Sequence, residues 1–425
     1  MALQIANYSE IEKIMTALES AGFKSYVIGD CVRYLVMDEE ALDWDMVTQA
    51  GPEELMGIFP DADVLDKERG VVRFDYTTEN ENGVILDVST MRDKEDKITD
   101  DIEKQLNGID FSVYGVAADI KGEIIDPCGG IKDIRNELVR CNGDAQKKIS
   151  DKPELAIISI RIAAETGYDL ARSLSDVIKL NAKKYSDISM DITRDEFLRI
   201  MDAPYTGKAL RMLAGTELIS LVVKDGVKRM KPRQKKHFLE FCERLDEANV
   251  GMEEKLCMFY TRFNPALINR FVMSMNYNDD IKECLVDIFD KLRLVASAKD
   301  ELSMKQAMQK LGKNQFEYVY RATLALDKMF DVQSGEARYR KGFYEKIIES
   351  GDPVYVEDLI ITVDDLKIVG ITDIKQANKI MKKLVKVVQM SPESNNRDDL
   401  LAHPKLFQMG RLGMFKVKHK KTNLN

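Results

Sequence analysis

The stretch Ser25-Tyr-Val-Ile-Gly29, followed by Asp43-Trp-Asp45, decides how the first part of the chain is interpreted. The apolar run predicts a short strand that ends at a glycine, and the pattern from Cys31 to Met37 is helical. If Asp43-Trp-Asp45 also lies in a strand, its two carboxylates project from one face, because side chains two residues apart point the same way. Two aligned carboxylates can hold a hard divalent cation, usually Mg²⁺, which in turn holds substrate phosphates.

A third carboxylate could join this pair from a neighbouring strand. Asp87 lies in the apolar run Ile85–Ser89. Three carboxylates on adjacent strands permit a two-metal arrangement for in-line phosphoryl or nucleotidyl transfer. An Asp-x-Asp alone is weak evidence, since most such pairs lie in surface loops. The preceding strand, the glycine and a helix carrying Arg33 make this one more informative.

The secondary-structure pattern changes along the chain. In residues 1–150 strands alternate with helices, and the runs 71–76 and 84–88, separated by a segment ending in Asn82-Gly83, predict a hairpin. From Pro153 onward the pattern predicts helices only. We therefore expect an α+β chain in which a small mixed part is followed by a long all-helical part.

Composition excludes several classes of protein. The 425 residues contain 63 Lys and Arg against 72 Asp and Glu, and only three histidines, too few for a His-rich metal site. The six cysteines form no Cys-x-x-Cys, which predicts buried thiols in a reducing cytosol. No apolar run is long enough for a membrane span, and no secretory signal is visible at the first residues, so the expected location is cytoplasmic.

Basic residues concentrate in the helical part despite the net charge of −9. Apolar residues in 374–388 are spaced three and four apart, which predicts one buried helix face. Five lysines lie elsewhere on that helix: Lys375, Lys379, Lys382, Lys383 and Lys386. They are either a solvated surface or a face that binds phosphates along a nucleic acid. Two further basic clusters occupy 228–236 and 411–421.

The motifs of residues 1–150 resemble those of class II tRNA nucleotidyltransferases, the CCA-adding enzymes, and of the related bacterial poly(A) polymerases. That family has an apolar strand, Gly-Gly-x-Val-Arg-Asp, a short helix and Asp-Trp-Asp. The matching residues here are Gly29, Val32, Arg33 and 43–45. The segments 87–92, 110–112 and 124–133 resemble the motifs that follow in the family, and 160–164 fits the helix that opens its neck.

The resemblance implies a nucleotidyltransferase head at 1–150, a helical neck at 151–225, a body at 226–340 and a basic tail at 341–425. No His-Asp dipeptide occurs, so the body is expected to lack the hydrolase motif found in many relatives. The implied reaction is attack of a tRNA 3′-hydroxyl on the α-phosphate of CTP or ATP. Asp43 and Asp45 would hold Mg²⁺, with a two-metal site expected and Asp87 assisting. The implied nucleotide-binding residues are Gly29, Arg33, Asp110, Asp151 and Lys152, and the five lysines of 374–388 would bind RNA.

The chain departs from the family motifs at several positions. The second glycine of Gly-Gly is Asp30, and the aspartate after Val-Arg is Tyr34. The neck motif Glu-Asp-x-x-Arg, which reads the base edge, falls on Asp151, Lys152 and Leu155. A lysine and a leucine cannot present the same donors and acceptors to a base. Three hypotheses stay open: an active enzyme with altered nucleotide or acceptor choice, a weakened or inactive paralogue that binds tRNA or another RNA, and drift with the aspartates kept only structurally.

Overall fold

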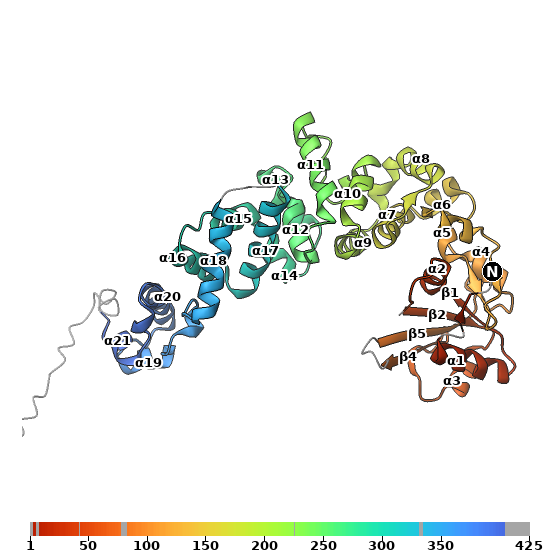
Figure 1. Ribbon diagram of the computed structural model, residues 1–425, viewed down its shortest axis with the longest axis horizontal. Helices are drawn as coiled ribbons and strands as arrows, with labels where there is room; N and C mark the ends of the chain where they lie inside the picture. Colours follow the sequence, from red (N-terminus) through yellow and green to blue (C-terminus); the bar gives the residue numbers. More distant parts are fainter. Residues whose placement is uncertain are drawn as a thin grey trace, which may run out of the picture. The chain divides into compact units, whose positions relative to one another are not determined.

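The computed structural model describes residues 3–5, 8–41, 43–77, 83–224, 226–330 and 335–403 (Figure 1). Its contacts divide the chain into two compact units. Unit 1 comprises residues 1–247 with 274–276, and unit 2 comprises 248–273 with 277–425. The hairpin turn at 78–82 and the basic cluster at 411–421 lie outside the described residues.

A seven-stranded mixed sheet forms the first part of unit 1, in the order β3-β4-β5-β2-β1-β6-β7. β1 is antiparallel to β2, β2 is parallel to β5, and β5 is antiparallel to β4. The last pair confirms the predicted hairpin. The strand bounds are β1 Ser25–Ile28, β2 Asp43–Thr48, β3 Asp63–Asp66, β4 Val71–Thr77, β5 Gly83–Thr90, β6 Ala117–Ala118 and β7 Ile124–Ile125.

Alternation along β2 explains why it faces the core on one side only. Trp44 and Met46 are buried, whereas Asp43 and Asp45 are exposed. The Trp44 indole N–H donates to the carbonyl of Ala41 at 2.9 Å, and its ring meets Tyr8 edge-on at 4.6 Å between centroids. The buried indole thus fixes the face on which the two aspartates stand.

The helices of unit 1 complete the head and then continue as a helical segment. Their bounds are α1 Ser9–Ser20, α2 Asp30–Val36, α3 Pro52–Ile58, α4 Ile102–Gly108, α5 Gly130–Arg135, α6 Ala145–Asp151, α7 Leu155–Thr166, α8 Arg172–Leu180, α9 Met190–Asp202, α10 Thr206–Gly215 and α11 Pro232–Leu245. The expectation of helices only beyond Pro153 is wrong at one point. The short strand β9 (Asp169–Leu170) pairs with β8 (Leu138–Val139), since that edge offers unpaired backbone groups.

The helix α11 belongs to unit 1. A Cβ on Gly207 of α10 would lie 1.9 Å from the carbonyl oxygen of Cys242 in α11, so only glycine allows this approach. The Asp246 carboxylate, just beyond α11, accepts hydrogen bonds from the backbone N–H groups of Gly207 and Lys208 at the start of α10. The sequence-based division at 225/226 therefore lies inside unit 1, and the four-part division stays a prediction.

Unit 2 consists of helices and irregular segments among its described residues. Its helices are α12 Met252–Tyr260, α13 Pro265–Ser274, α14 Asp279–Leu285, α15 Ile288–Ala296, α16 Glu301–Leu311, α17 Lys313–Met329, α18 Gly335–Ser350, α19 Val363–Ile368, α20 Ile374–Met390 and α21 Arg397–Ala402. α20 buries Ala377, Met381, Leu384 and Val388 in one cluster, as its spacing predicts, although Ile374 is exposed.

The fold class predicted from sequence is confirmed: a small mixed head precedes a long helical part. All six cysteines are free thiols and buried. Within the described residues, no helix has the length and apolar character needed to cross a membrane.

Candidate active site

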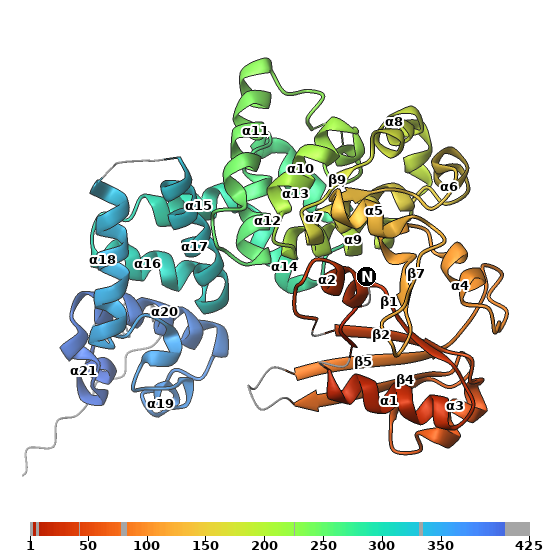
Figure 2. The same cartoon turned by 45° about the vertical axis from the view of Figure 1, so that its right-hand side comes forward.

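The sheet register brings the candidate residues of the head into one row. Asp45 of β2 is the register partner of Asp87 of β5, and Asp87 is the partner of Arg73 of β4. Register partners on adjacent strands project from the same face, so these three side chains are neighbours. Asp43 stands two residues before Asp45 on that face. Figure 2 shows β2, β5 and β4 side by side, with α2 next to β2.

Asp43 and Asp45 are exposed residues at the start of β2. Among the described residues, no hydrogen bond or ion pair reaches either carboxylate. Although Asp45 is exposed as a residue, its carboxylate lies against Gly29, where a Cβ would be 3.0 Å from Oδ2. This partial burial, together with the charges of Asp43 and Asp87, raises the pKa of Asp45 to about 6. Burial and the Asp87 charge also raise the pKa of Asp43.

Asp87 differs from the other two carboxylates because both of its oxygens are occupied. Arg73 Nε donates to Oδ1 and Arg73 Nη2 donates to Oδ2, each at 2.7 Å. The Asp87 side chain is 24% exposed and that of Arg73 is 37% exposed. Sequence reasoning missed Arg73, and its only signal was its place in the run predicted to pair with the Asp87 strand.

Arg33 lies in α2, directly after the glycine turn, and its side chain is buried beside two neighbouring residues. Gly29 has φ 76° and ψ −142° at the start of α2. The Arg33 side chain is 7% exposed, its Nε donates to Asp30 at 2.9 Å, and its guanidinium lies 4.1 Å from the centre of the Tyr34 ring. The two residues that depart from the family motif, Asp30 and Tyr34, therefore both contact Arg33.

The structure brings the predicted Asp110 and Lys152 together. Lys152 Nζ lies 3.3 Å from Asp110, and Lys148, one helical turn earlier, donates to the same carboxylate at 2.8 Å. Lys148 was not predicted from the sequence, although its spacing of four from Lys152 places both lysines on one side of the chain. Asp151 ends α6 and is exposed, and Leu155 at the start of α7 is buried. The side chain at position 155 therefore carries no hydrogen-bonding group.

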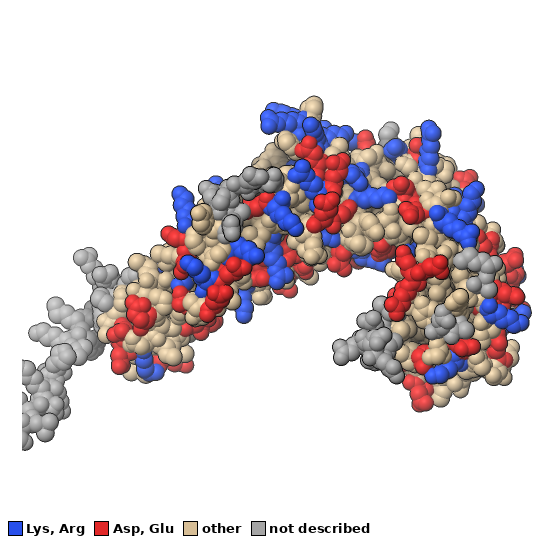
Figure 3. All heavy atoms as spheres, in the orientation of Figure 1, with Lys and Arg blue, Asp and Glu red and all other residues tan. Residues whose placement is uncertain are grey.

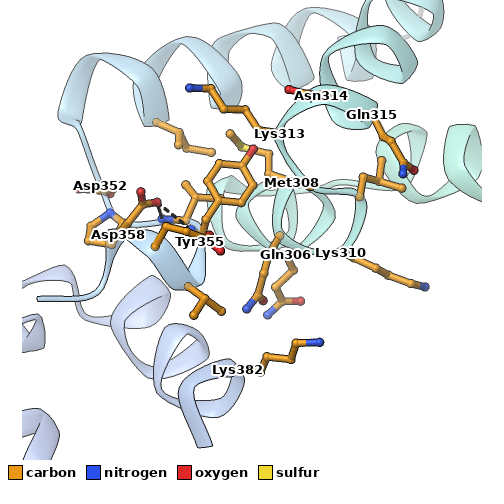
Figure 4. A pocket seen from close by; sticks show the side chains of 18 of the residues that line it. Gln306, Met308, Lys310, Lys313, Asn314, Gln315, Asp352, Tyr355, Asp358 and Lys382 are labelled. Carbon is orange, nitrogen blue, oxygen red and sulfur yellow. Dashed lines mark hydrogen bonds between the residues drawn. The ribbon is translucent and has the colours of Figure 1, made fainter. Parts of the chain in front are cut away.

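The lysines predicted to bind RNA all lie in unit 2, on exposed positions of α20. No described acid pairs with Lys375, Lys379, Lys382, Lys383 or Lys386. Three of them, Lys382, Lys383 and Lys386, line a groove of about 1670 Å³ together with residues of α16, α17 and the segment before α19. Figure 4 shows Lys310, Lys313 and Lys382 around this groove. Figure 3 shows a second gathering of basic side chains on α11.

Which residues could hold a metal ion follows from the donor set. Within the described parts of the chain, no group of three or more His, Cys, Asp or Glu side chains converges as a metal site. Asp43 and Asp45 fit Mg²⁺ as a pair, because Mg²⁺ commonly takes one or two carboxylates together with water and substrate phosphates. Their exposure on one face leaves room for those additional ligands.

Parts of the chain are similar to known proteins. Residues 25–140 match the Poly A polymerase head domain family. The chain is 26% identical over 215 residues to a CCA-adding enzyme of Lactobacillus helveticus, which covers 48% of this chain and 53% of that protein. It is 29% identical over 218 residues to the CCA-adding enzyme of Geobacillus stearothermophilus, covering 50% of this chain and 54% of that protein. The chain therefore spans about half the length of the curated relatives it matches.

Similarity of fold extends further than similarity of sequence. The crystal structure of the Bacillus stearothermophilus CCA-adding enzyme in complex with CTP matches with a TM-score of 0.77 at 20% identity, over 95% of this chain and 98% of that one. A complex of a CCA-adding enzyme with ATP matches with a TM-score of 0.67 at 14% identity, over 96% of both chains. At these identities the structures establish the fold alone. The head-domain match and the curated relatives support the resemblance of this chain to the class II tRNA nucleotidyltransferases and the related poly(A) polymerases.

Proposed function

We propose that this protein is a template-independent RNA nucleotidyltransferase of the CCA-adding type, which transfers C, A or both from CTP and ATP to a tRNA 3′ end in a Mg²⁺-dependent reaction. One observation carries the proposal: Asp43 and Asp45 stand on one exposed face of the head, and their carboxylates have no partner among the described residues. Relatives named as CCA-adding enzymes support the choice of acceptor and nucleotides.

In the proposed reaction, the 3′-hydroxyl oxygen forms a bond to the α-phosphorus of the nucleotide, the bond to the β-phosphate oxygen breaks, and pyrophosphate leaves. Bound Mg²⁺ would stabilise the charge of the triphosphate and favour ionisation of the attacking hydroxyl. Asp43 and Asp45 would hold it, and the buried Trp44 between them orients both carboxylates. Asp87 completes the row of acidic residues.

Residues of α2 and α6 would shape the nucleotide site. Lys148 and Lys152 place two ammonium groups beside Asp110, and they can bind triphosphate oxygens when the nucleotide enters. Arg33 is tied to Asp30, so it would support the Gly29 turn rather than contact phosphate directly. Leu155 offers a base no hydrogen-bonding partner, and we expect looser base selection than an Asp–Arg pair would give.

The helical unit 2 would hold the RNA acceptor. The five exposed lysines of α20 have no described acidic partner, so their charge is available to phosphates. Contacts of this kind fix the position of an RNA without reading its sequence. The location of such an enzyme would be the cytoplasm, where its tRNA substrate and free nucleotides are found.

Extension of a tRNA that lacks its 3′ CCA tests the proposal. The full chain is incubated with Mg²⁺, each NTP separately and all four together, and the products are resolved at single-nucleotide length. The proposal predicts addition from CTP or ATP, lost in the Asp43→Ala/Asp45→Ala variant. No extension with any NTP, alongside salt-sensitive tRNA binding, would instead identify a non-catalytic RNA-binding paralogue. Extension that survives the double substitution would refute the assignment of the carboxylates.

A further inference from the structure

The third carboxylate of the row is bound differently from the other two. Both oxygens of Asp87 accept charge-assisted hydrogen bonds from one guanidinium, each at 2.7 Å. Asp43 and Asp45 have no such partner among the described residues. A paired fork of this geometry is among the stronger polar interactions in proteins, and only arginine supplies it.

We propose that Arg73 keeps Asp87 out of metal coordination, so that the divalent-cation site of this head is formed by Asp43 and Asp45 alone. Arg73 is then a positioning residue: it sets how many carboxylates a cation meets. This inference deepens the proposed function and rests on it for the role of the cation, but its test requires neither nucleotide transfer nor RNA.

The strand register makes the pairing a fixed feature of the sheet. Arg73 and Asp87 are direct register partners in the antiparallel pair of β4 and β5, a pair that extends from Val71 to Thr77 and from Gly83 to Ser89. Their side chains therefore leave the same face at neighbouring points, and the fork forms without displacement of either backbone. A cation at Asp87 would have to displace the Arg73 guanidinium or share the carboxylate oxygens with it, and the guanidinium charge opposes a cation at that position.

The arrangement of the donors agrees with this role. Asp45 is the partner of Asp87 on the other side of β5, so a cation at Asp45 would be within reach of a free Asp87 side chain. Yet no three acidic, His or Cys side chains of the described residues converge as a metal site. Since the number of charged ligands sets affinity for hard cations, occupation of Asp87 by Arg73 lowers the affinity of the site.

The test measures Mn²⁺ binding to the metal-free full chain, from the electron paramagnetic resonance signal of unbound Mn²⁺, in the absence of nucleotide. The informative variant is Arg73→Met/Asp87→Asn, because it replaces an ion pair of zero net charge with a neutral pair. We expect it to keep the wild-type Mn²⁺ affinity within about twofold, whereas Asp45→Asn weakens binding at least tenfold. Arg73→Met alone frees Asp87 and should tighten binding at least fivefold. Arg69→Met is the matched control, since it removes a head arginine paired with Asp96 and should have no effect.

Three results would overturn the inference. The first is a loss of affinity in Arg73→Met/Asp87→Asn as large as that in Asp45→Asn, which would make Asp87 a ligand. The second is unchanged affinity in Arg73→Met. The third is that the wild-type protein binds Mn²⁺ no more tightly than Asp45→Asn does. Fluorescence of Trp44, the only tryptophan, verifies that each variant is folded. Failure of nucleotide transfer would refute the proposed function and leave these binding results to decide the role of Arg73.

Discussion

Gly29→Ala is the substitution whose effect the structure predicts most completely. Gly29 has φ 76° and ψ −142°, a conformation that is almost restricted to glycine. Forcing another residue into such a region costs about 1–3 kcal/mol, and the reduced freedom of the unfolded chain offsets about 0.4–1 kcal/mol of it. The expected loss in the free energy of unfolding is therefore about 1–2 kcal/mol.

The same substitution should also weaken metal binding. The added Cβ would lie 3.0 Å from Oδ2 of Asp45, so the carboxylate must move away from its position beside Asp43. The assay is urea unfolding followed by Trp44 fluorescence, combined with Mn²⁺ binding. Gly22→Ala is the matched control, since Gly22 has φ +91° but no heavy atom within 4 Å of an added Cβ. It should lose stability and keep wild-type Mn²⁺ affinity.

Gly57→Ala serves as the reference for a glycine substitution without backbone strain. Gly57 lies in α3 with an ordinary φ and open space around an added Cβ, so alanine there should be neutral or slightly stabilising. If Gly29→Ala were as stable as Gly57→Ala, the strain at Gly29 would be absent. If Gly29→Ala were destabilised but bound Mn²⁺ like the wild type, the contact with Asp45 would have no bearing on the site.

Three further predictions concern pH, RNA and nucleotide binding. Because the pKa of Asp45 is raised from 3.8 to about 6 in the folded state, the metal-free protein should lose stability as pH rises from about 4 to about 6. Urea unfolding should show a smaller fall in Asp45→Asn than in the wild type, since the raised pKa of Asp43 remains in that variant. Three lysines of α20 line the groove: Lys382, Lys383 and Lys386. Replacing all three with glutamine should make tRNA binding less sensitive to salt, so that the slope of log affinity against log salt concentration becomes smaller by about two to three. The control replaces three lysines that are already in ion pairs, Lys341, Lys346 and Lys367, and it should change this slope little. Lys148→Met with Lys152→Met should raise the KM for the nucleotide about tenfold with a smaller change in kcat, measured by steady-state extension.

Local patterns predicted the parts of this molecule that depend on local geometry. The alternation in Asp43-Trp-Asp45 gave the exposed carboxylate face correctly, because side-chain direction in a strand follows from period two. The apolar spacing in 374–388 gave the buried face of α20 for the same kind of reason, with Ile374 as the exception at the first turn.

The pairings of the candidate site could not be predicted in this way. Arg73 meets Asp87 because of the register of β4 on β5, which short-range patterns do not determine. The Arg33–Asp30 pair is different, since a spacing of three within the predicted helix makes the two side chains neighbours and could have indicated it. Lys148 of α6 donates to Asp110, which follows α4 and lies 38 positions earlier in the chain. The contacts of Arg73 and Lys148 therefore depend on tertiary structure.

In the proposed function, Asp43 and Asp45 hold the divalent cation on the triphosphate. A crystal structure of the full chain with Mn²⁺ and a non-hydrolysable CTP or ATP analogue, with anomalous data collected at the manganese edge, tests it most directly. We expect an anomalous peak from an ion that is coordinated by both carboxylates and by the triphosphate, with Asp87 still paired to Arg73. A nucleotide bound in the head without Mn²⁺ at Asp43 and Asp45, or Mn²⁺ coordinated elsewhere in the head, would contradict it.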